Sequence, residues 1–211
     1  MAELAWAGLD TPVGRLSVGC SPAGVSQVRF GSPPRPAAVS SPAGPGAMPT
    51  PPAGPGATPT PPAGPGATPT PPAGPGAAAD PRTDALNQLA EYFSGRRQSF
   101  DLPLDWSTMS RLQRRVLGVL FDSVGYGETV SYGTLARRVQ SADGTLVPAR
   151  VIGQVMGSNP IPLIVPCHRV VAADGLGGYS GGTGLEVKRW MLTFEGALPP
   201  TLDWEPSRLP A

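Results

Sequence analysis

Two neighbouring residues, Cys167 and His168, carry the groups best suited to nucleophilic chemistry. A cysteine attacks as its thiolate, and a free thiol with a pKa of about 8.5 is mostly protonated at neutral pH. It becomes reactive when a base lies beside it and a third group holds that base. His168 is the only histidine of the chain, so no other imidazole competes for this role. Glu195 is a candidate third member, because a carboxylate on the far ring nitrogen would fix the tautomer and stabilise the imidazolium.

The pair also constrains the local backbone. Adjacent side chains on regular structure point apart, so the sequence predicts that Cys167 and His168 lie on a bent segment, where a water could bridge them. Taken alone, the dipeptide favours a different interpretation, in which Cys167 packs as a small apolar side chain.

The segments around Cys167 are predicted to bury it. Residues 161–165 are apolar but include Pro162, which indicates a buried stretch that is not a regular central strand. A glycine-rich loop over 175–184 follows the pair. The spacing then predicts a helix over 186–195, which Gly196 ends.

Two short helices are expected upstream, over 131–139 and 149–157, joined by a loop through Gly144 and Pro148. This outline is typical of a helix-turn-helix, although many helical pairs share it. Arg150 opens the second helix, where a side chain can reach a duplex.

Formal net charge is only +1, so any nucleic-acid contact must come from a local patch or from shape. Arginines do gather in the middle of the chain, and most of them are interpreted as residues of solvated helix faces. This group comprises Arg111, Arg114, Arg115, Arg137, Arg138, Arg150 and Arg169.

The N-terminal part predicts a mixture of strand and helix. Apolar residues alternate over 11–30 around a Pro/Gly turn, which indicates a β-hairpin with Cys20 as a small buried side chain at the end of its first strand. Helical spacing over 85–93 predicts a helix that stops at Gly95, and 100–104 is a short extended piece.

A further helix is expected from the N-cap Ser110 to about residue 122. Its inner face is predicted to consist of Leu112, Val116, Val119 and Leu120.

Between the hairpin and these helices, residues from about 31 to 79 consist almost entirely of Pro, Gly, Ala and Thr. A ten-residue unit that begins at Ala53 is repeated from Ala63. Glycine does not recur at every third position, which excludes collagen. The unit offers almost nothing to bury, so we interpret it as a disordered insertion with polyproline-II character.

Composition excludes several other classes. The chain has 211 residues with two cysteines and one histidine, whereas a structural zinc site needs about four such ligands. We therefore expect no metal. No stretch approaches the roughly 20 apolar residues of a membrane span, so no membrane partner is expected.

The chemistry-bearing residues lie in motifs that resemble the O6-alkylguanine-DNA alkyltransferase (methylated-DNA–protein-cysteine methyltransferase) family. The resemblance covers nearly the whole segment 111–196 in order, and more loosely the N-terminal part. Its motifs are PCHRV at 166–170, GETVSY at 127–132, ARVIG at 149–153, NPIP at 159–162, GYSGG at 178–182, KRWML at 188–192 and FEG at 194–196.

The resemblance implies that Cys167 takes the alkyl group from O6 of a damaged guanine in DNA and keeps it, one base per protein molecule. His168 would remove the thiol proton through water, with Glu195 orienting His168. Asn159 would be a hinge, and Tyr132 would rotate the 3′ phosphate and donate to the flipped base.

It also implies how DNA and the base are held. Arg150 would be a finger inserted from the minor groove, with Tyr132, Ala149 and Arg137 as further DNA-binding residues. The base pocket would comprise Met156, Val170, Tyr179 and Ser180, with the backbone at Cys167 and Val170 reading the guanine edge.

The implied fold is an α/β, ribonuclease H-like N-terminal domain over 1–104, interrupted by the insertion at about 31–79. A mainly α domain with the helix-turn-helix follows over 105–198, and then a tail over 199–211. The implied partner is double-stranded DNA containing O6-alkylguanine, bound by a monomer without a cofactor. We expect a cytoplasmic protein that is associated with the nucleoid when bound to DNA.

The chain departs from the family pattern in the insertion, in a longer loop between Tyr132 and Arg150, and over 175–188. Because of the last departure, the sequence leaves open which alkyl groups the pocket accepts. Activity on O4-alkylthymine is also left open. Three other functions account for only part of the chain: a lesion sensor without chemistry, a cysteine hydrolase that uses Cys167, His168 and Glu195, and a transcription regulator.

Overall fold

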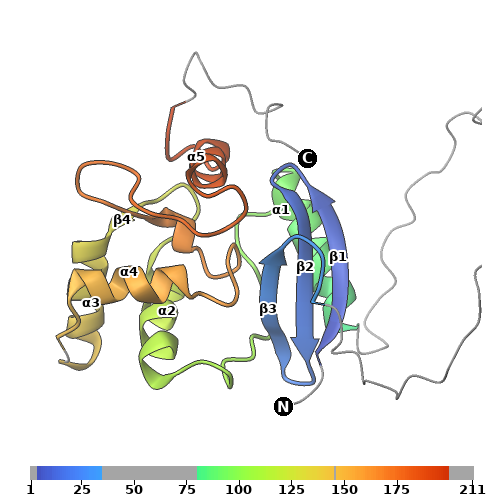
Figure 1. Cartoon of the computed structure of the whole chain (residues 1–211), viewed down its shortest axis with the longest axis horizontal. Coiled ribbons are helices and arrows are strands. Elements are labelled where there is room, and N and C mark those ends of the chain that lie inside the picture. Colours follow the sequence, from blue (N-terminus) through green and yellow to red (C-terminus); the bar gives the residue numbers. More distant parts are fainter. Residues whose placement is uncertain (1–3, 35–79, 145, 200–211) are drawn as a thin grey trace, which may run out of the picture. The chain divides into compact units, whose positions relative to one another are not determined.

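The computed structural model describes residues 4–34, 80–144 and 146–199, and these belong to one compact unit (Figure 1). Most of the expected insertion at about 31–79, and the tail from 200 onward, lie outside the described residues. The predicted boundary at 104/105 remains a prediction.

The N-terminal part is a three-stranded antiparallel sheet in the order β1-β2-β3, with β1 at Ala5–Thr11, β2 at Gly14–Ser21 and β3 at Gly24–Phe30 (Figure 1). The hairpin predicted over 11–30 is confirmed as β2 and β3. The first strand was not predicted, because its residues are exposed or half-buried and show little apolar alternation.

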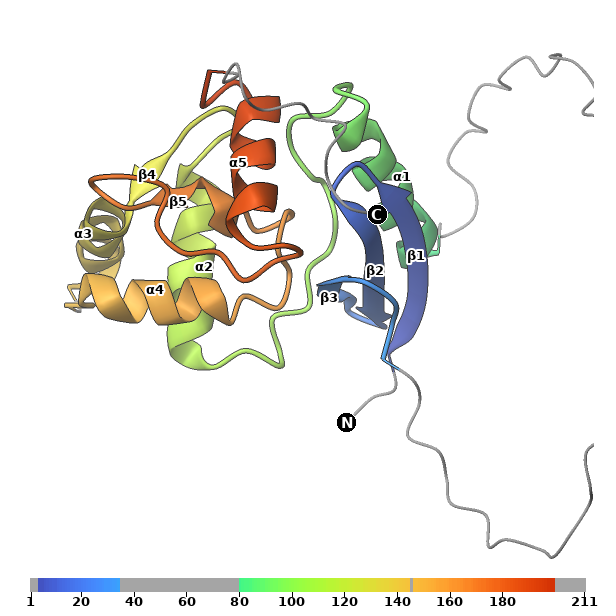
Figure 2. The same ribbon diagram turned by 45° about the horizontal axis from the view of Figure 1, so that its top comes forward.

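Helix α1 (Pro81–Phe93) packs against this sheet (Figure 2). It starts earlier than the apolar spacing indicated, because Asp80 caps it by accepting from Arg82 N and Pro81 suits the first helical position. The predicted end at Gly95 is confirmed, since this residue has a left-handed φ of 74°. The inward residues of α1 are Ala85, Leu89 and Tyr92, which are fully buried.

Helix α2 (Arg111–Ser123) begins at the expected cap. Ser110 and Gln113 form a capping box in which each side chain bonds the other residue's backbone N–H. The predicted inner face is right for Val116 and Leu120 but wrong for Leu112, which is 37% exposed. Leu112 belongs to the first turn, and Leu117 is buried instead.

Helices α3 (Tyr132–Asp143) and α4 (Ala149–Gly157) pack against each other and against α2. Both helices were predicted, although α3 runs further than expected and ends at Gly144 with a left-handed φ of 78°. A short parallel pairing of β4 (Val130–Ser131) with β5 (Val170–Val171) holds the start of α3 beside the residues that follow His168.

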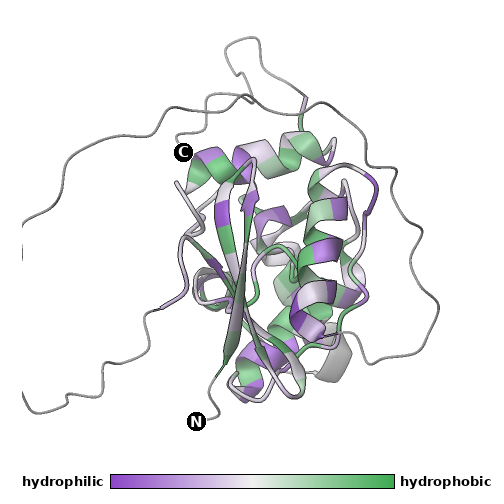
Figure 3. Cartoon of the chain, turned by 90° about the vertical axis from the view of Figure 1, so that its right-hand side faces the viewer, coloured by the Kyte–Doolittle hydropathy of each residue, from purple (hydrophilic) through white to green (hydrophobic). Residues whose placement is uncertain are grey.

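The last helix, α5 (Leu185–Phe194), ends at Glu195, its C-cap residue. Green and purple bands alternate along the helices in Figure 3, as expected for helices buried on one side only. None of the described helices combines the length and apolar composition required to cross a membrane.

Candidate active site

Cys167, His168 and Arg169 form a single turn of 3-10 helix, and all three are buried. The predicted bent segment is therefore confirmed. The stretch before it, 161–165, is buried and irregular as expected, with Leu163 in the left-handed region at φ 74°. The 3-10 turn therefore places the side chains of consecutive residues in the same buried site.

Asn159 ties the end of α4 to this segment. Its Nδ2 donates to the Val165 carbonyl at 2.9 Å, and its Oδ1 accepts from Ile161 N at 3.1 Å. A single side chain thus spans the connection between the helix pair and Cys167, which is the position expected of a hinge residue.

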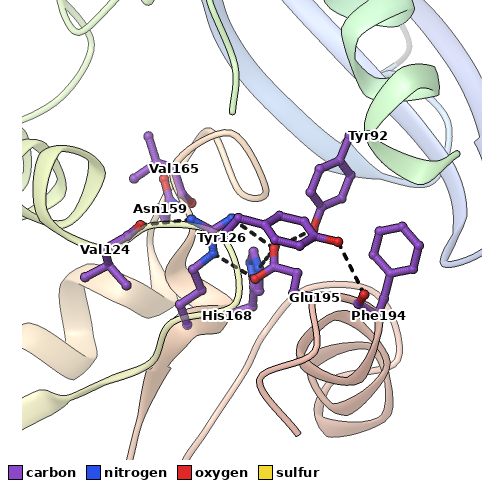
Figure 4. A network of polar contacts seen from close by, with 9 residues as sticks. Tyr92, Val124, Tyr126, Asn159, Val165, His168, Phe194 and Glu195 are labelled. Atoms are coloured by element: carbon purple, nitrogen blue, oxygen red, sulfur yellow. Dashed lines mark hydrogen bonds and ion pairs between the residues drawn. The ribbon is translucent and has the colours of Figure 1, made fainter. Parts of the chain in front are cut away.

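His168 and Glu195 are in direct contact at the centre of Figure 4. Nε2 of His168 lies 3.0 Å from Oε1 of Glu195, and both side chains are fully buried. Nδ1 of His168 is buried and has no hydrogen-bond partner among the described residues. The carboxylate therefore holds one ring nitrogen, and the other is left to take a proton.

Glu195 accepts from further donors. The Arg169 guanidinium bonds both of its oxygens at 2.9 Å, and the Tyr92 hydroxyl donates to Oε1 at 2.6 Å. Nη1 of Arg169 also donates to the Val124 carbonyl at 2.9 Å. Interpreting Arg169 as part of a solvated arginine face is therefore wrong, because its partners lie inside the protein and only 6% of it is exposed.

Two cavities meet at Cys167. One of about 380 Å³ is lined by Tyr132, Met156, Tyr179 and Ser180. Another of about 570 Å³ extends from Cys167 towards β3 and shares Met156, Tyr179 and Ser180 with the first. The structure thus brings four predicted residues to the thiol.

Val170, by contrast, lines neither cavity in the described part of the chain, and its carbonyl accepts from Lys188 Nζ at 2.6 Å.

Residues 111–197 match the family model for the DNA-binding domain of 6-O-methylguanine DNA methyltransferase. A methylated-DNA–protein-cysteine methyltransferase from Mycolicibacterium paratuberculosis is 44% identical over 112 residues, which cover 53% of this chain and 63% of the relative. A DNA base-flipping protein from Thermus thermophilus is 45% identical over 113 residues, which cover 51% of this chain and 68% of that protein. The chain belongs to the O6-methylguanine-DNA methyltransferase family.

A solved structure supports this membership over a longer stretch. The crystal structure of OGT from Mycobacterium tuberculosis in complex with DNA has a TM-score of 0.61 and 27% identity, over 91% of this chain and 93% of that one. The sequence match to the first of the curated relatives spans just under two thirds of that relative's length.

Burial and hydrogen bonding set the charge states at this methyltransferase-family centre. Burial raises the pKa of Cys167, although Asn159 and Lys188 act to lower it. Burial lowers the pKa of His168, against the opposing effect of Glu195. Burial would raise the pKa of Glu195, but His168 and Arg169 together lower it to about 2. The resting centre therefore holds a neutral thiol, a neutral imidazole and a charged carboxylate.

Lys188 is a site residue that the sequence analysis missed. Besides Val170, its Nζ bonds the Gly178 carbonyl at 3.1 Å and lies 5.9 Å from the centre of the Tyr132 ring. Burial lowers its pKa to about 8, while Cys167 acts to raise it. The sequence did offer a signal: Lys188 precedes Met191 by three residues and Leu192 by four, which places this charged residue on the apolar face of α5.

The loop that carries Tyr179 and Ser180 is fitted closely to its neighbours. A Cβ added at Gly181 would lie 2.6 Å from Phe30 Cε2 and 2.7 Å from Tyr179 Cε1, so only glycine fits there. Ser180 Oγ donates to the Gly157 carbonyl at 3.2 Å. The loop is thereby fastened between β3 and the end of α4.

Of the residues predicted to bind DNA, Tyr132 lines the smaller cavity, whereas Ala149, Arg150 and Arg137 line neither cavity. Ala149 and Arg150 are exposed at the start of α4. Arg137 is exposed on α3, where its Nη2 donates to Thr134 Oγ1 at 2.9 Å. All three are accessible, as contact with a duplex would require.

The low pKa of Glu195 predicts a pH-dependent contribution to stability. The folded value of about 2 lies below the ordinary 4.5, so the contribution is present above about pH 4.5 and is lost as the pH falls towards 2. We expect wild type to exceed Glu195→Gln in free energy of unfolding at pH 7, and the gap to close between pH 4.5 and pH 2. Urea denaturation across this range measures it, and a gap that does not vary with pH would contradict the assignment.

Proposed function

We propose that this protein repairs alkylated DNA by direct reversal, with irreversible transfer of a methyl or other alkyl group from O6 of guanine to Cys167. The observation that carries the proposal is the meeting of two cavities at a buried thiol whose neighbour His168 is held by Glu195. Family membership supplies the reaction class.

The chemistry follows from these groups. The alkylated oxygen lies inside a stacked base pair, so the nucleotide must be flipped out at a cost of a few kcal/mol. His168 accepts the thiol proton at Nδ1 through a water, while Glu195 stabilises the imidazolium on the other nitrogen. The neutral resting pair implies that this transfer accompanies substrate binding.

The thiolate then displaces guanine from the alkyl carbon. The new C–S bond forms as the C–O6 bond breaks, and the bonding pair leaves with guanine, which takes up a proton. Tyr132 lines the smaller cavity, and burial raises the pKa of its phenol, so it holds a proton for this purpose. A thioether has no easy reversal, so each molecule reacts once.

The proposed partner is double-stranded DNA that contains O6-alkylguanine. Helices α3 and α4 would act as a helix-turn-helix in the minor groove, with Arg150 inserted where the flipped nucleotide was. The relative from Mycobacterium tuberculosis has been solved in complex with DNA. The sheet and α1 would correspond to a ribonuclease H-like domain, and the protein would act as a monomer on DNA inside the cell.

The mass of the intact protein tests the transfer. After incubation with excess duplex that contains one O6-methylguanine, we expect a gain of one CH₂ unit that saturates at one per molecule and maps to Cys167 by peptide analysis. An unchanged mass with no lesion-specific binding would exclude the repair function.

A second candidate, recognition of the lesion without chemistry, is favoured by one observation: the Thermus relative at 45% identity is a DNA base-flipping protein. An unchanged mass with retained lesion-specific binding would support this function instead.

A further inference from the structure

A residue from the N-terminal part of the chain enters the active-site network. Tyr92 lies on α1, and its hydroxyl donates to Oε1 of Glu195 at 2.6 Å (Figure 4). The same oxygen is bonded to His168 Nε2 at 3.0 Å and accepts from Arg169 Nη2 at 2.9 Å. Tyr92 therefore shares with His168 the oxygen that supports the imidazolium.

The position of this hydroxyl is fixed by packing. Tyr92 is fully buried, and its ring centre lies 5.2–6.1 Å from those of four other aromatic residues. These neighbours are Phe93, Phe100, Tyr126 and Phe194. With its ring enclosed in this way, the phenol has little freedom to turn away, and a buried tyrosine hydroxyl requires a partner. Glu195 supplies it.

We propose that Tyr92 is a positioning residue for alkyl transfer: its hydroxyl holds Oε1 of Glu195 and weakens the attraction of that oxygen for the proton on His168. Helix α1 thereby acts on Cys167 through Glu195 and His168. This inference rests on the proposed transfer reaction, in which His168 must be neutral before it can accept the thiol proton.

The direction of the effect follows from the groups that surround the pair. Glu195 is faced by Tyr92 from α1, Tyr126 from the loop after α2, and His168 and Arg169 from the 3-10 turn. His168 is also faced by Lys188 from α5. Tyr92→Phe removes one donor from Oε1 and leaves the cations unchanged. Oε1 then attracts the His168 proton more strongly, and the pKa of His168 rises.

The first experiment measures single-turnover transfer from O6-methylguanine duplex between pH 5.5 and 9. We expect the acidic limb of the Tyr92→Phe profile to move to higher pH, with the rate at the acidic end reduced roughly threefold and the rate above pH 8 little changed. Tyr126→Phe is the matched control: its hydroxyl donates to the Phe194 carbonyl at 3.3 Å, so this variant also removes a phenol from the same cluster. We expect no shift for Tyr126→Phe.

A double-mutant cycle separates positioning from general packing. If Tyr92 acts through Glu195, Tyr92→Phe should not change the His168 pKa, measured by NMR, in a Glu195→Gln background, where transfer itself is expected to be lost. A shift of the same size in both backgrounds, or no shift in either, would overturn the proposal.

The second experiment does not depend on DNA repair. His168 is the only histidine of the chain, so in untagged protein its imidazole NMR signals need no assignment. We expect a higher His168 pKa in Tyr92→Phe than in wild type or Tyr126→Phe. If Tyr92→Phe does not fold, replacing Tyr92 alone with the more acidic 3-fluorotyrosine should lower the His168 pKa instead.

An unchanged His168 pKa would refute the inference even if alkyl transfer is observed. If Tyr92→Phe shifts the His168 pKa but the wild-type protein transfers no alkyl group, only the proposed function is refuted.

Discussion

Cys167→Ser is expected to abolish alkyl transfer while leaving the affinity for alkylated DNA within about twofold of wild type. Serine is close to cysteine in size, so both cavities and the segment from 161 to 169 should keep their shape. Its hydroxyl gives up a proton far less readily than a thiol, and oxygen is a weaker nucleophile than a thiolate towards an alkyl carbon. The Cys167→Ser variant should therefore lose alkyl transfer but keep its binding to alkylated DNA.

Cys20→Ser is the matched control for this loss. Cys20 is the only other cysteine, and it is buried on β2 at a cavity bordered by Asp80 and Arg82 rather than at His168. Its variant should gain one methyl group per molecule, as wild type does. The measurements are intact mass for transfer and fluorescence anisotropy with a lesion-containing duplex for binding. Transfer that persisted in Cys167→Ser, or that disappeared in Cys20→Ser, would contradict the assignment of Cys167 as the acceptor.

Much of the local structure was predictable because its signals are local. Ser110 is the expected N-cap of α2, and its capping box with Gln113 spans only three residues. The Cys167–His168 dipeptide required a bend, and the structure has a 3-10 turn there. The His168–Glu195 contact was also anticipated, because so few acidic side chains follow the pair in the sequence.

The remaining parts of the site depend on contacts that no local pattern reveals. Tyr92 and Glu195 are 103 residues apart, and the apolar spacing of α1 identifies Tyr92 only as a buried residue, not as a donor to a carboxylate. Arg169 was grouped with surface arginines because composition does not show where a counter-charge lies. Strand β1 was missed because it pairs through its backbone while its side chains stay partly exposed.

The groups around Cys167 come from several separate parts of the sequence. Cys167 and His168 come from one short segment, yet their pKa values also depend on Asn159 after α4, on Lys188 of α5 and on Glu195. Tyr92 of α1 in turn bonds Glu195. Several elements of the compact unit therefore contribute to this centre, and one contact to Glu195 comes from the N-terminal helix α1, which the family model of residues 111–197 does not cover.

Glu195→Ala is the second large effect, and it concerns stability as well as activity. The change removes the acceptor of Arg169, His168 and Tyr92 at once and leaves the guanidinium of Arg169 buried without its counter-ion. Breaking a buried ion pair from one side costs about 3–5 kcal/mol. We expect that loss in the free energy of unfolding by urea, together with loss of transfer.

The contrast with an exposed pair gives the control. Glu91 binds Arg97 Nε at 2.7 Å, but the two side chains are 41% and 28% exposed. Solvent screens such a pair, so Glu91→Ala should cost no more than about 1 kcal/mol and leave transfer unchanged. Equal losses in the two variants would show that the buried network contributes nothing special to stability.

Adding Arg169→Met to Glu195→Ala then separates the two roles of Glu195. The double variant no longer buries an unpaired charge, and replacing a buried ion pair by apolar side chains is often neutral or stabilising. We expect it to regain much of the lost stability. Transfer should remain absent, because no carboxylate supports the imidazolium of His168 when it takes the thiol proton. Recovery of transfer along with stability would mean that Glu195 serves the fold alone, and that His168 needs no partner to activate Cys167.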